Sequence, residues 1–313
     1  MADGSGHSIA PLGTPCAESP EQLAISIGCL CRATGAEMDA AVYRLAKAES
    51  RESVNQASIT PVSPVIRSSK QDVSLSVVPV CVSVEEGYER WAATYDDAPN
   101  PLLHLEERKL TALLPDLGGK CALDLACGTG RWLEKISDMG TGVRVGVDFS
   151  SAMLRVAGKK AAIHGRLARA DCLSLPFQAS IFELVVCSFG LGHVSDLGRA
   201  LSELARVTKD GADVVVSDLH AEAYARGWRT GFRDSRGAVR IEMKPRSAEE
   251  IIRAFYSAGF ECLTHLPLCL GEPEKPIFAR AGKGHLFTRA CQVPAVLVCH
   301  FRRSTQSESR GGS

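Results

Sequence analysis

The sequence predicts an α/β fold in which a mostly parallel sheet is covered by helices on both faces. After residue 115, apolar runs typical of strands alternate with amphipathic runs typical of helices. One of these strands also leads into a glycine turn that opens a helix. The expected strands are 121–126, 143–148, 166–170, 183–188, 212–218, 262–269 and 294–301, and the expected helices are 130–138, 150–162, 196–207 and 247–258.

The most informative stretch is the strand and turn at 121–130, Cys-Ala-Leu-Asp-Leu-Ala-Cys-Gly-Thr-Gly. Gly128 and Gly130 permit positive φ and remove the Cβ atoms that would block a ligand lying on the loop. Asp124 lies inside the strand, where a charge is costly unless another group compensates it. Strand, turn and helix N-terminus together form a nucleotide-type cradle, although the dinucleotide spacing G-x-G-x-x-G is absent. The alternative is a tight turn without a ligand.

Composition limits the classes of function. With 313 residues, the chain has room for one large α/β domain and an extension. A formal net charge of zero gives little support to binding of nucleic acid or of an anionic membrane surface. No apolar run is long enough to span a membrane, and the first residues lack the features of a secretory signal, so we expect a cytoplasmic protein. The twelve cysteines are scattered, and we interpret them as reduced small hydrophobic residues without a metal.

The chain divides into three parts. Residues 1–83 form an N-terminal extension, which we expect to be partly disordered, with one or two short helices at 21–49 and an extended segment near 73–82. Residues 84–303 form the α/β domain, and residues 304–313 a disordered tail.

Two helices and a hairpin complete the expected domain. Tyr88, Trp91, Ala92 and Tyr95 are spaced to share one face of a helix at 85–95. A second helix begins at Asn100-Pro101, with asparagine as cap, and Pro115 ends it. At 227–243, the segments Arg229 to Arg233 and Ala238 to Met243 flank a turn, which predicts a β-hairpin.

A second acidic residue follows the glycine turn at the spacing of a nucleotide site. Asp148 ends the strand at 143–148, about twenty residues after the turn, where a carboxylate can accept both hydroxyls of a ribose. Phe149 beside it is placed to pack against an adenine. In the alternative interpretation Asp148 is the N-cap of the helix at 150–162, although Ser150 can also do this.

These motifs resemble the class I S-adenosylmethionine (SAM) methyltransferases. D-L-A-C-G-T-G resembles their motif I, D/E-x-G-x-G-x-G, with Ala126 in place of the first glycine. Residues 170–177 resemble the family segment A-D-x-x-x-L-P-F. Residues 182–194 resemble a run of the ubiquinone/menaquinone C-methyltransferases and, more loosely, of the type 11 group. Residues 201–211 resemble a helix-closing segment in altered form, with Asp210 for its proline and Ala212 for its second glycine.

The resemblance spans residues 85–302 and implies a Rossmann-like, seven-stranded sheet that binds SAM. It implies that Asp171 accepts from the adenine amino group, that the backbone after it meets a ring nitrogen, and that Tyr95 contacts the methionyl part. The aromatic helix at 85–95 is implied to cover the site. Motifs and resemblance together give the expected cofactor-binding residues Tyr88, Tyr95, Asp124, Ala126, Cys127, Gly128, Gly130, Asp148, Phe149, Asp171, Cys172, Ser188 and Phe189.

The methyl acceptor is less well defined. Methyl transfer from a sulfonium needs mainly positioning, and it needs a base only if the acceptor holds its proton. His193 and His220 follow strands at the binding edge and are candidate bases; each is equally explained as a surface or packing residue. Arg229, Arg233 and Arg236 on the hairpin could pair with an anionic acceptor, although exposed arginines usually only solvate a surface.

We therefore predict a SAM-dependent methyltransferase acting on a small molecule of the quinone or secondary-metabolite type. One alternative is a carboxyl O-methyltransferase that acts on a free or carrier-bound acid, such as a malonyl group. Another is a scaffold that binds SAM or S-adenosylhomocysteine (SAH) without turnover. We expect no nucleic acid, membrane span or metal, and the oligomeric state stays open.

Overall fold

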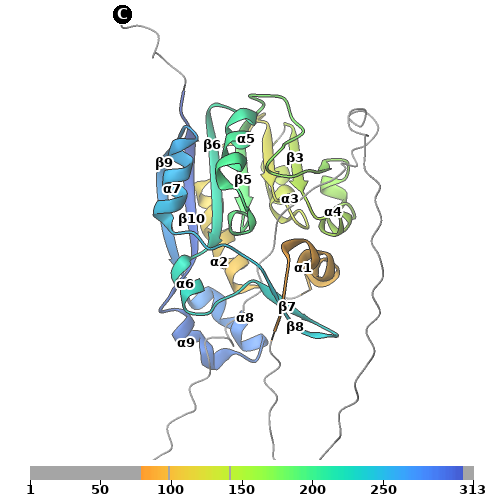
Figure 1. The fold of residues 1–313 in the computed structure, drawn as a ribbon, viewed down its shortest axis with the longest axis vertical. Coiled ribbons are helices and arrows are strands. Elements are labelled where there is room, and N and C mark those ends of the chain that lie inside the picture. Colours follow the sequence, from red (N-terminus) through yellow and green to blue (C-terminus); the bar gives the residue numbers. More distant parts are fainter. Residues whose placement is uncertain (1–78, 98, 141, 306–313) are drawn as a thin grey trace, which may run out of the picture.

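A computed structural model describes residues 79–97, 99–140 and 142–305. Within these residues the main sheet has seven strands in the order β4-β3-β2-β5-β6-β10-β9 (Figure 1). Its strands are β2 Ala122–Leu125, β3 Arg144–Asp148, β4 Leu167–Arg169, β5 Phe182–Ser188, β6 Thr208–Leu219, β9 Phe260–Cys269 and β10 Pro294–Arg303. β10 runs antiparallel to β6 and β9, whereas the other neighbouring pairs are parallel. The predicted fold class, a mostly parallel seven-stranded sheet, is confirmed.

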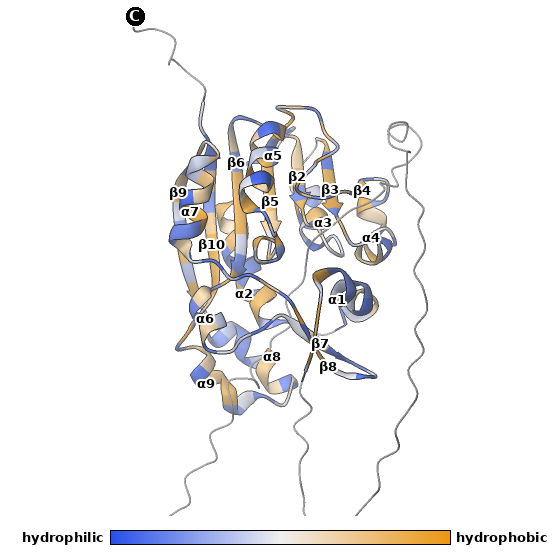
Figure 2. Ribbon diagram, viewed as in Figure 1, coloured by the Kyte–Doolittle hydropathy of each residue, from blue (hydrophilic) through white to orange (hydrophobic). Residues whose placement is uncertain are grey.

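Helices cover both faces of this sheet. One face carries α2 Pro101–Leu110, α3 Arg131–Asp138, α6 Ala221–Ala225, α8 Lys275–Arg280 and α9 Phe287–Ala290. The other carries α5 Leu197–Val207 and α7 Ala248–Ser257. Each helix buries an apolar stripe, such as Trp132 and Leu133 from α3 or Ile251 and Phe255 from α7. In Figure 2 the strands are largely hydrophobic, while the helices alternate along their length.

Local capping fixes where several helices begin. The Asn100 side chain accepts from the backbone N–H of Leu102 at 2.9 Å, and Pro101 takes the first position of α2. Ser247 and Glu250 form a capping box at α7. The helix expected at 150–162 is shorter: α4 is Ser151–Ala157, and a separate 3₁₀ turn spans Ala161–Ile163. The predicted end was therefore wrong by about one turn.

A second, three-stranded sheet lies beside the main one, in the order β1-β8-β7. β7 (Gly231–Asp234) and β8 (Gly237–Ile241) form the antiparallel hairpin that the sequence predicts. β1 (Val80–Val82) pairs parallel with β8, although it precedes the expected domain boundary at residue 84. The helices expected at 21–49 and most of the extended segment expected near 73–82 lie outside the described residues.

Helix α1 (Val84–Trp91) is joined to the hairpin and follows β1 directly. An Arg90 guanidinium nitrogen lies 2.7 Å from the Asp234 carboxylate, and the Trp91 ring stacks on Phe232 with centroids 5.1 Å apart. We call α1, β1, β7 and β8 together the cap. In Figure 1 the cap lies below the main sheet, and α4 lies next to α1. Tyr88 of α1 packs with Met153 of α4 in one buried cluster.

The nine cysteines among the described residues are free thiols. Within the same ranges, no set of His, Cys, Asp and Glu side chains is grouped as metal ligands would be. No helix there combines the length and the apolar character that crossing a bilayer requires.

Candidate functional site

The loops after four neighbouring strands meet at one edge of the sheet. Because β4, β3, β2 and β5 are adjacent and parallel, their carboxyl ends lie side by side. Asp171 follows β4, Asp148 ends β3, the glycine turn follows β2, and Ser188 ends β5. Open α/β sheets bind ligands at this edge. The sheet order therefore places the sequence-predicted residues in a row.

The turn after β2 has the backbone that the sequence predicts. Ala126, Gly128 and Gly130 have φ values of +66°, +54° and +81°. A Cβ on Gly130 would contact Cδ1 of Ile163, so a larger residue there would require the Ile163 side chain to move in addition to adopting positive φ. Ala126 adopts positive φ at the position where motif I commonly has glycine, at a modest conformational cost.

Asp148 holds this turn in place. Its Oδ2 accepts from the backbone N–H of Gly128 at 2.8 Å, and its Oδ1 accepts from that of Ser150 at 2.8 Å. Ser150, not Asp148, caps α4, because its hydroxyl accepts from the N–H of Met153 at 3.3 Å. The N-cap interpretation of Asp148 is therefore wrong. Phe149 next to it is buried.

Asp124 lies beneath the turn and carries the unpaired group of the site. It is 1% exposed, and its Oδ2 has no hydrogen-bond partner among the described residues. Burial raises the pKa of Asp124 to about 7, although the backbone of Leu133 and the charge of Arg131 act in the opposite direction; the nearby carboxylates of Asp148 and Glu106 add a smaller increase. A buried polar atom without a partner is costly and points to a missing donor. A small cavity of about 20 Å³ borders Asp124 and is lined by Tyr95, Leu103, Asp124, Ala126, Cys127, Gly128, Thr129, Arg131, Trp132 and Ser188.

Arg131 brings a cation to the same cavity. Its Nη2 donates to Oε2 of Glu106 at 2.8 Å and to the Ser188 hydroxyl at 2.9 Å. Glu106 is fully buried and also accepts from Trp132 Nε1 and the Ser217 hydroxyl, at 3.0 Å and 2.9 Å. Sequence reasoning missed Arg131 and Glu106. The sequence did contain one sign of Glu106: its carboxylate falls on the buried face of α2, next to Leu105, where a charge needs a partner.

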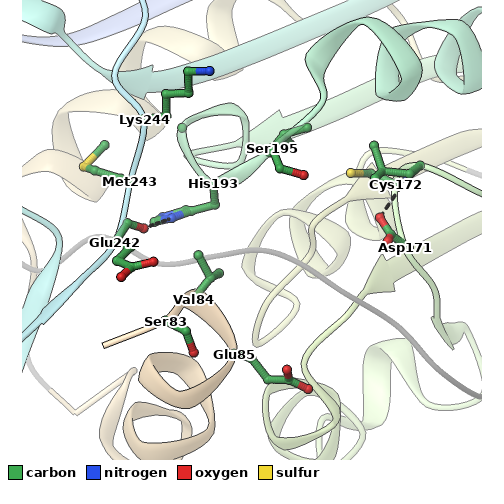
Figure 3. Close-up of a pocket in the computed structure, with 13 residues that line it drawn as sticks. Ser83, Val84, Glu85, Asp171, Cys172, His193, Ser195, Glu242, Met243 and Lys244 are labelled. Atoms are coloured by element: carbon green, nitrogen blue, oxygen red, sulfur yellow. Dashed lines mark hydrogen bonds between the residues drawn. The ribbon is translucent and has the colours of Figure 1, made fainter. Parts of the chain in front are cut away.

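A larger pocket of about 600 Å³ opens beside this edge (Figure 3). Four segments line it: 83–85 at the start of α1, 171–173 after β4, 192–195 after β5, and 242–244 after β8. Asp171 is half-buried, and its Oδ1 accepts from the backbone N–H of Leu173 at 2.9 Å. Cys172 is buried in the wall. The size of this pocket suits a small organic ligand.

His193 lies in this pocket wall with a defined tautomer. Its Nδ1 is 2.9 Å from the carbonyl oxygen of Glu242, drawn as a dashed line in Figure 3. Because a carbonyl only accepts, Nδ1 carries the proton, and Nε2 accepts from the Tyr88 hydroxyl at 3.2 Å. Burial lowers the pKa of His193 to about 4, so the ring is neutral near pH 7.

Other predicted residues lie elsewhere. His220 caps α6, with Nδ1 accepting from the N–H of Glu222 at 3.2 Å, and it lines neither cavity. Phe189 has φ +52° and is packed in the core with α2 and α3. Arg229 lies over the Tyr224 ring at 3.7 Å and donates to two backbone carbonyls. Neither Arg233 nor Arg236 lines either cavity.

Comparisons with known proteins bear on the family and the fold. Residues 122–211 match a family model described as a methyltransferase domain. A demethylmenaquinone methyltransferase of Staphylococcus aureus is 38% identical over 128 residues, which are 38% of this chain and 53% of the relative. The chain thus spans about half the length of that curated relative.

Two solved structures share the fold. A SAM-dependent methyltransferase from Mesorhizobium loti matches with a TM-score of 0.50 at 22% identity, over 64% of this chain and 98% of the other. A chain in the Haloferax volcanii complex of the Trm112 methyltransferase activator with a methyltransferase matches with a TM-score of 0.54 at 18% identity, over 72% and 99%.

Proposed function

We propose that this chain, which contains a class I SAM-dependent methyltransferase domain, transfers the methyl group of SAM to a small-molecule acceptor of the quinone or secondary-metabolite type. The observation that carries the proposal is the order of groups along the sheet edge: Asp171, Asp148, the glycine turn and Ser188. This order corresponds to adenine, ribose and methionyl group, the three parts of one extended ligand.

The residues around the small cavity suit the methionyl end. An α-amino acid carries an ammonium and a carboxylate, and the cavity is lined by the unpaired Oδ2 of Asp124 and by the guanidinium of Arg131. Asp124 would take the ammonium, and Arg131 would pair with the carboxylate. Tyr95 borders the same cavity from the segment after α1. An ammonium at Asp124 would remove the cost of its unpaired oxygen.

Asp148 and Asp171 would hold the nucleoside end. The backbone N–H groups of Gly128 and Ser150 hold the Asp148 carboxylate at the end of β3, where it would accept hydrogen bonds from the ribose hydroxyls. Asp171 and Cys172 border the larger pocket, where a carboxylate and a backbone N–H can receive the edge of an adenine. Phe149 follows Asp148 directly and would pack near the base.

SAM supplies an activated methyl carbon, so the protein has to position the acceptor and keep water out. The cap contributes to exclusion, because Tyr88 and Trp91 are buried. His193 Nε2 would receive a proton from an acceptor hydroxyl, directly or through Tyr88, since the neutral ring holds a lone pair there. His220 has no part in this proposal.

Two observations bear on the acceptor. The Staphylococcus aureus relative is a demethylmenaquinone methyltransferase, which supports a quinone-type acceptor. Arg229, which lies between α6 and β7, is engaged with Tyr224 and with backbone carbonyls, which weakens the case for an acid held by this arginine. The carboxyl methyltransferase and the scaffold without turnover therefore remain as outcomes of the test.

The test combines binding with turnover. Calorimetry should show SAH binding to the parent, loss of affinity in Asp124→Asn, and unchanged affinity in the exposed control Asp138→Asn. An assay for SAH release should then detect transfer to phenols or reduced quinones. Turnover of acids alone would assign the carboxyl alternative, and binding without turnover the scaffold. A parent that binds neither SAM nor SAH would overturn the proposal.

A further inference from the structure

The turn that carries His193 is held by hydrogen bonds from two segments that are distant in the chain, the end of β6 and the residues after β8. We call residues 191–194 the His193 turn and residues 242–246, which follow β8, the strap. The turn follows β5 in the chain, whereas the strap arrives from the hairpin about fifty residues later. All but one of the contacts between them are hydrogen bonds to the backbone of the turn, so they fix its conformation as well as its position, and the remaining one holds the His193 ring.

From the sheet side, Asp218 holds the turn. This residue lies near the end of β6 and is 8% exposed. Its Oδ2 accepts from the backbone N–H of Gly192, directly before His193, and its Oδ1 accepts from its neighbour Leu219 at 2.8 Å. A Cβ on Gly192 would lie 3.1 Å from Cε of Met243 and 3.2 Å from both oxygens of Asp218, so a larger residue would require these neighbours to shift by a few tenths of an ångström.

Three residues of the strap hold the turn through four further hydrogen bonds. The Arg246 guanidinium donates to the carbonyl oxygens of Leu191 and, at 2.6 Å, of Val194. The backbone N–H of Lys244 donates to the carbonyl of Gly192 at 2.6 Å. The carbonyl of Glu242 accepts from Nδ1 of His193 at 2.9 Å.

The choice of arginine is informative. Arg246 is partly buried, and both of its hydrogen-bond acceptors are neutral carbonyls rather than a carboxylate. Burial lowers the pKa of Arg246, opposed by the charges of Asp218 and Glu250, so placing a cation here has a cost. A planar guanidinium can bridge the two carbonyls that flank His193, which a lysine ammonium does with poorer geometry.

We propose that Asp218 and Arg246 are positioning residues for His193: they hold its turn so that Nδ1 stays protonated on the Glu242 carbonyl and Nε2 stays the unprotonated nitrogen that meets the Tyr88 hydroxyl and takes the proton through it. The inference rests on the proposed function. In the reaction, an electron pair of the acceptor forms the new bond to the methyl carbon, the carbon–sulfur bond breaks toward sulfur, and the acceptor proton goes to Nε2. The resulting imidazolium keeps its Nδ1–H on Glu242.

The first test is spectroscopic and needs no acceptor. In protein with ¹⁵N-labelled imidazole rings, the His193 signal, assigned with His193→Gln, should show the Nδ1–H tautomer alone. Arg246→Met should give mixed tautomers, and Arg246→Lys should restore part of the parent pattern. Arg253→Met, an exposed position on α7, serves as the matched control and should leave the signal unchanged.

The second test is kinetic and uses an acceptor found in the turnover assay. Arg246→Met and Asp218→Asn should lower kcat about tenfold to a hundredfold, with KM for SAM unchanged. If Arg246→Met does not fold, Arg246→Lys and Asp218→Asn decide by the same two measurements. A single Nδ1–H tautomer in Arg246→Met or Asp218→Asn would overturn this positioning role. If the parent fails to bind SAH, the proposed function falls, whereas the tautomer result still decides the positioning role.

Discussion

The Tyr88 hydroxyl lies 3.2 Å from Nε2 of His193 and joins the cap to the turn after β5. The two rings meet edge to face, with centroids 5.6 Å apart. Because Nδ1 of His193 donates to the carbonyl of Glu242, which follows β8, the imidazole connects α1 with the segment after β8. The tautomer of the His193 ring therefore decides which of its nitrogens can accept from α1.

Replacing Tyr88 by phenylalanine tests this contact. The change removes the donor to a buried nitrogen, so we expect Tyr88→Phe to lower the free energy of unfolding by about 1 kcal/mol. Urea denaturation monitored by circular dichroism measures it. Tyr256→Phe, on a side chain that is 77% exposed, should have no measurable effect. Equal stability of Tyr88→Phe and the parent would mean that the hydrogen bond does not form in solution.

Asp124 should make ligand binding depend on pH. Burial raises its pKa to about 7 in the free protein, so part of the population is protonated near neutrality. An ammonium on Oδ2 favours the carboxylate, so binding lowers the pKa and releases a proton at pH values below about 7. SAH affinity should therefore rise with pH up to about 7 and then level off. Calorimetry in buffers of different ionisation enthalpy measures the released proton.

Asp124→Asn provides the comparison, because its amide has nearly the same shape and does not titrate. We expect weaker SAH binding whose affinity is flat across the same range of pH. A parent whose affinity is also flat would show that the ammonium does not bind at Asp124.

Two separable effects favour glycine at position 130. Its φ of +81° strains any residue with a Cβ, and that Cβ would lie 2.3 Å from Cδ1 of Ile163. Gly119 has φ +71° and no atom within 4 Å of the place where a Cβ would lie, so it isolates the conformational cost. We expect Gly119→Ala to lose about 1 kcal/mol, and Gly130→Ala more. In Gly130→Ala, adding Ile163→Val should restore part of the loss, which thermal unfolding of the parent and the three variants would measure.

If Ile163→Val gave no recovery in the Gly130→Ala background, the contact with Ile163 would not limit the turn. Equal losses in the Gly119 and Gly130 variants would lead to the same conclusion.

The local parts of the fold could be predicted because their signals lie close together in the chain. The strand, turn and helix at 121–138 depend on apolar residues, glycines and a helix start within one stretch. The hairpin at β7 and β8 follows from its turn, where Asp234 accepts from the N–H of Arg236 at 2.8 Å. Asp148 was placed correctly at the end of its strand, but its bond to Gly128 was not foreseen.

The parts that escaped prediction depend on distant pairings. β1 pairs with β8, about 160 residues later, and nothing in Val80–Val82 identifies that partner. Glu106 meets Arg131 and Ser217 only after α2 has packed on the sheet. The tautomer of His193 depends on a backbone carbonyl at Glu242, which carries no side-chain signal at all. The short helices α6, α8 and α9 are likewise stabilised by packing more than by their own sequence.

Glu274 should be important for stability without affecting the proposed site. It is fully buried and accepts from His104 Nδ1 at 2.8 Å, from Arg108 Nη2 at 2.9 Å and from the N–H of Gly271 at 2.9 Å. These bonds join α2 to the segment before α8. Glu274→Gln should lower the free energy of unfolding by about 2 kcal/mol, because a charged acceptor is lost. His104 and Arg108 are partly exposed and regain water, which limits the loss.

The pH dependence of this loss has a definite sign. Burial raises the pKa of Glu274, but hydrogen bonds from His104, Gly271 and Arg108 outweigh it and leave the pKa below its ordinary value. The unfolded chain then binds more protons, so this stabilisation is present above the unfolded pKa and is lost as the pH falls through the folded one. Glu274→Gln should therefore differ most from the parent near neutral pH and least in acid. Glu272→Gln, whose side chain is 77% exposed beside Lys275, should match the parent in urea titrations at both pH values, with SAH affinity unchanged in both variants. Equal losses from the two substitutions would show that Glu274 contributes no more than a surface charge.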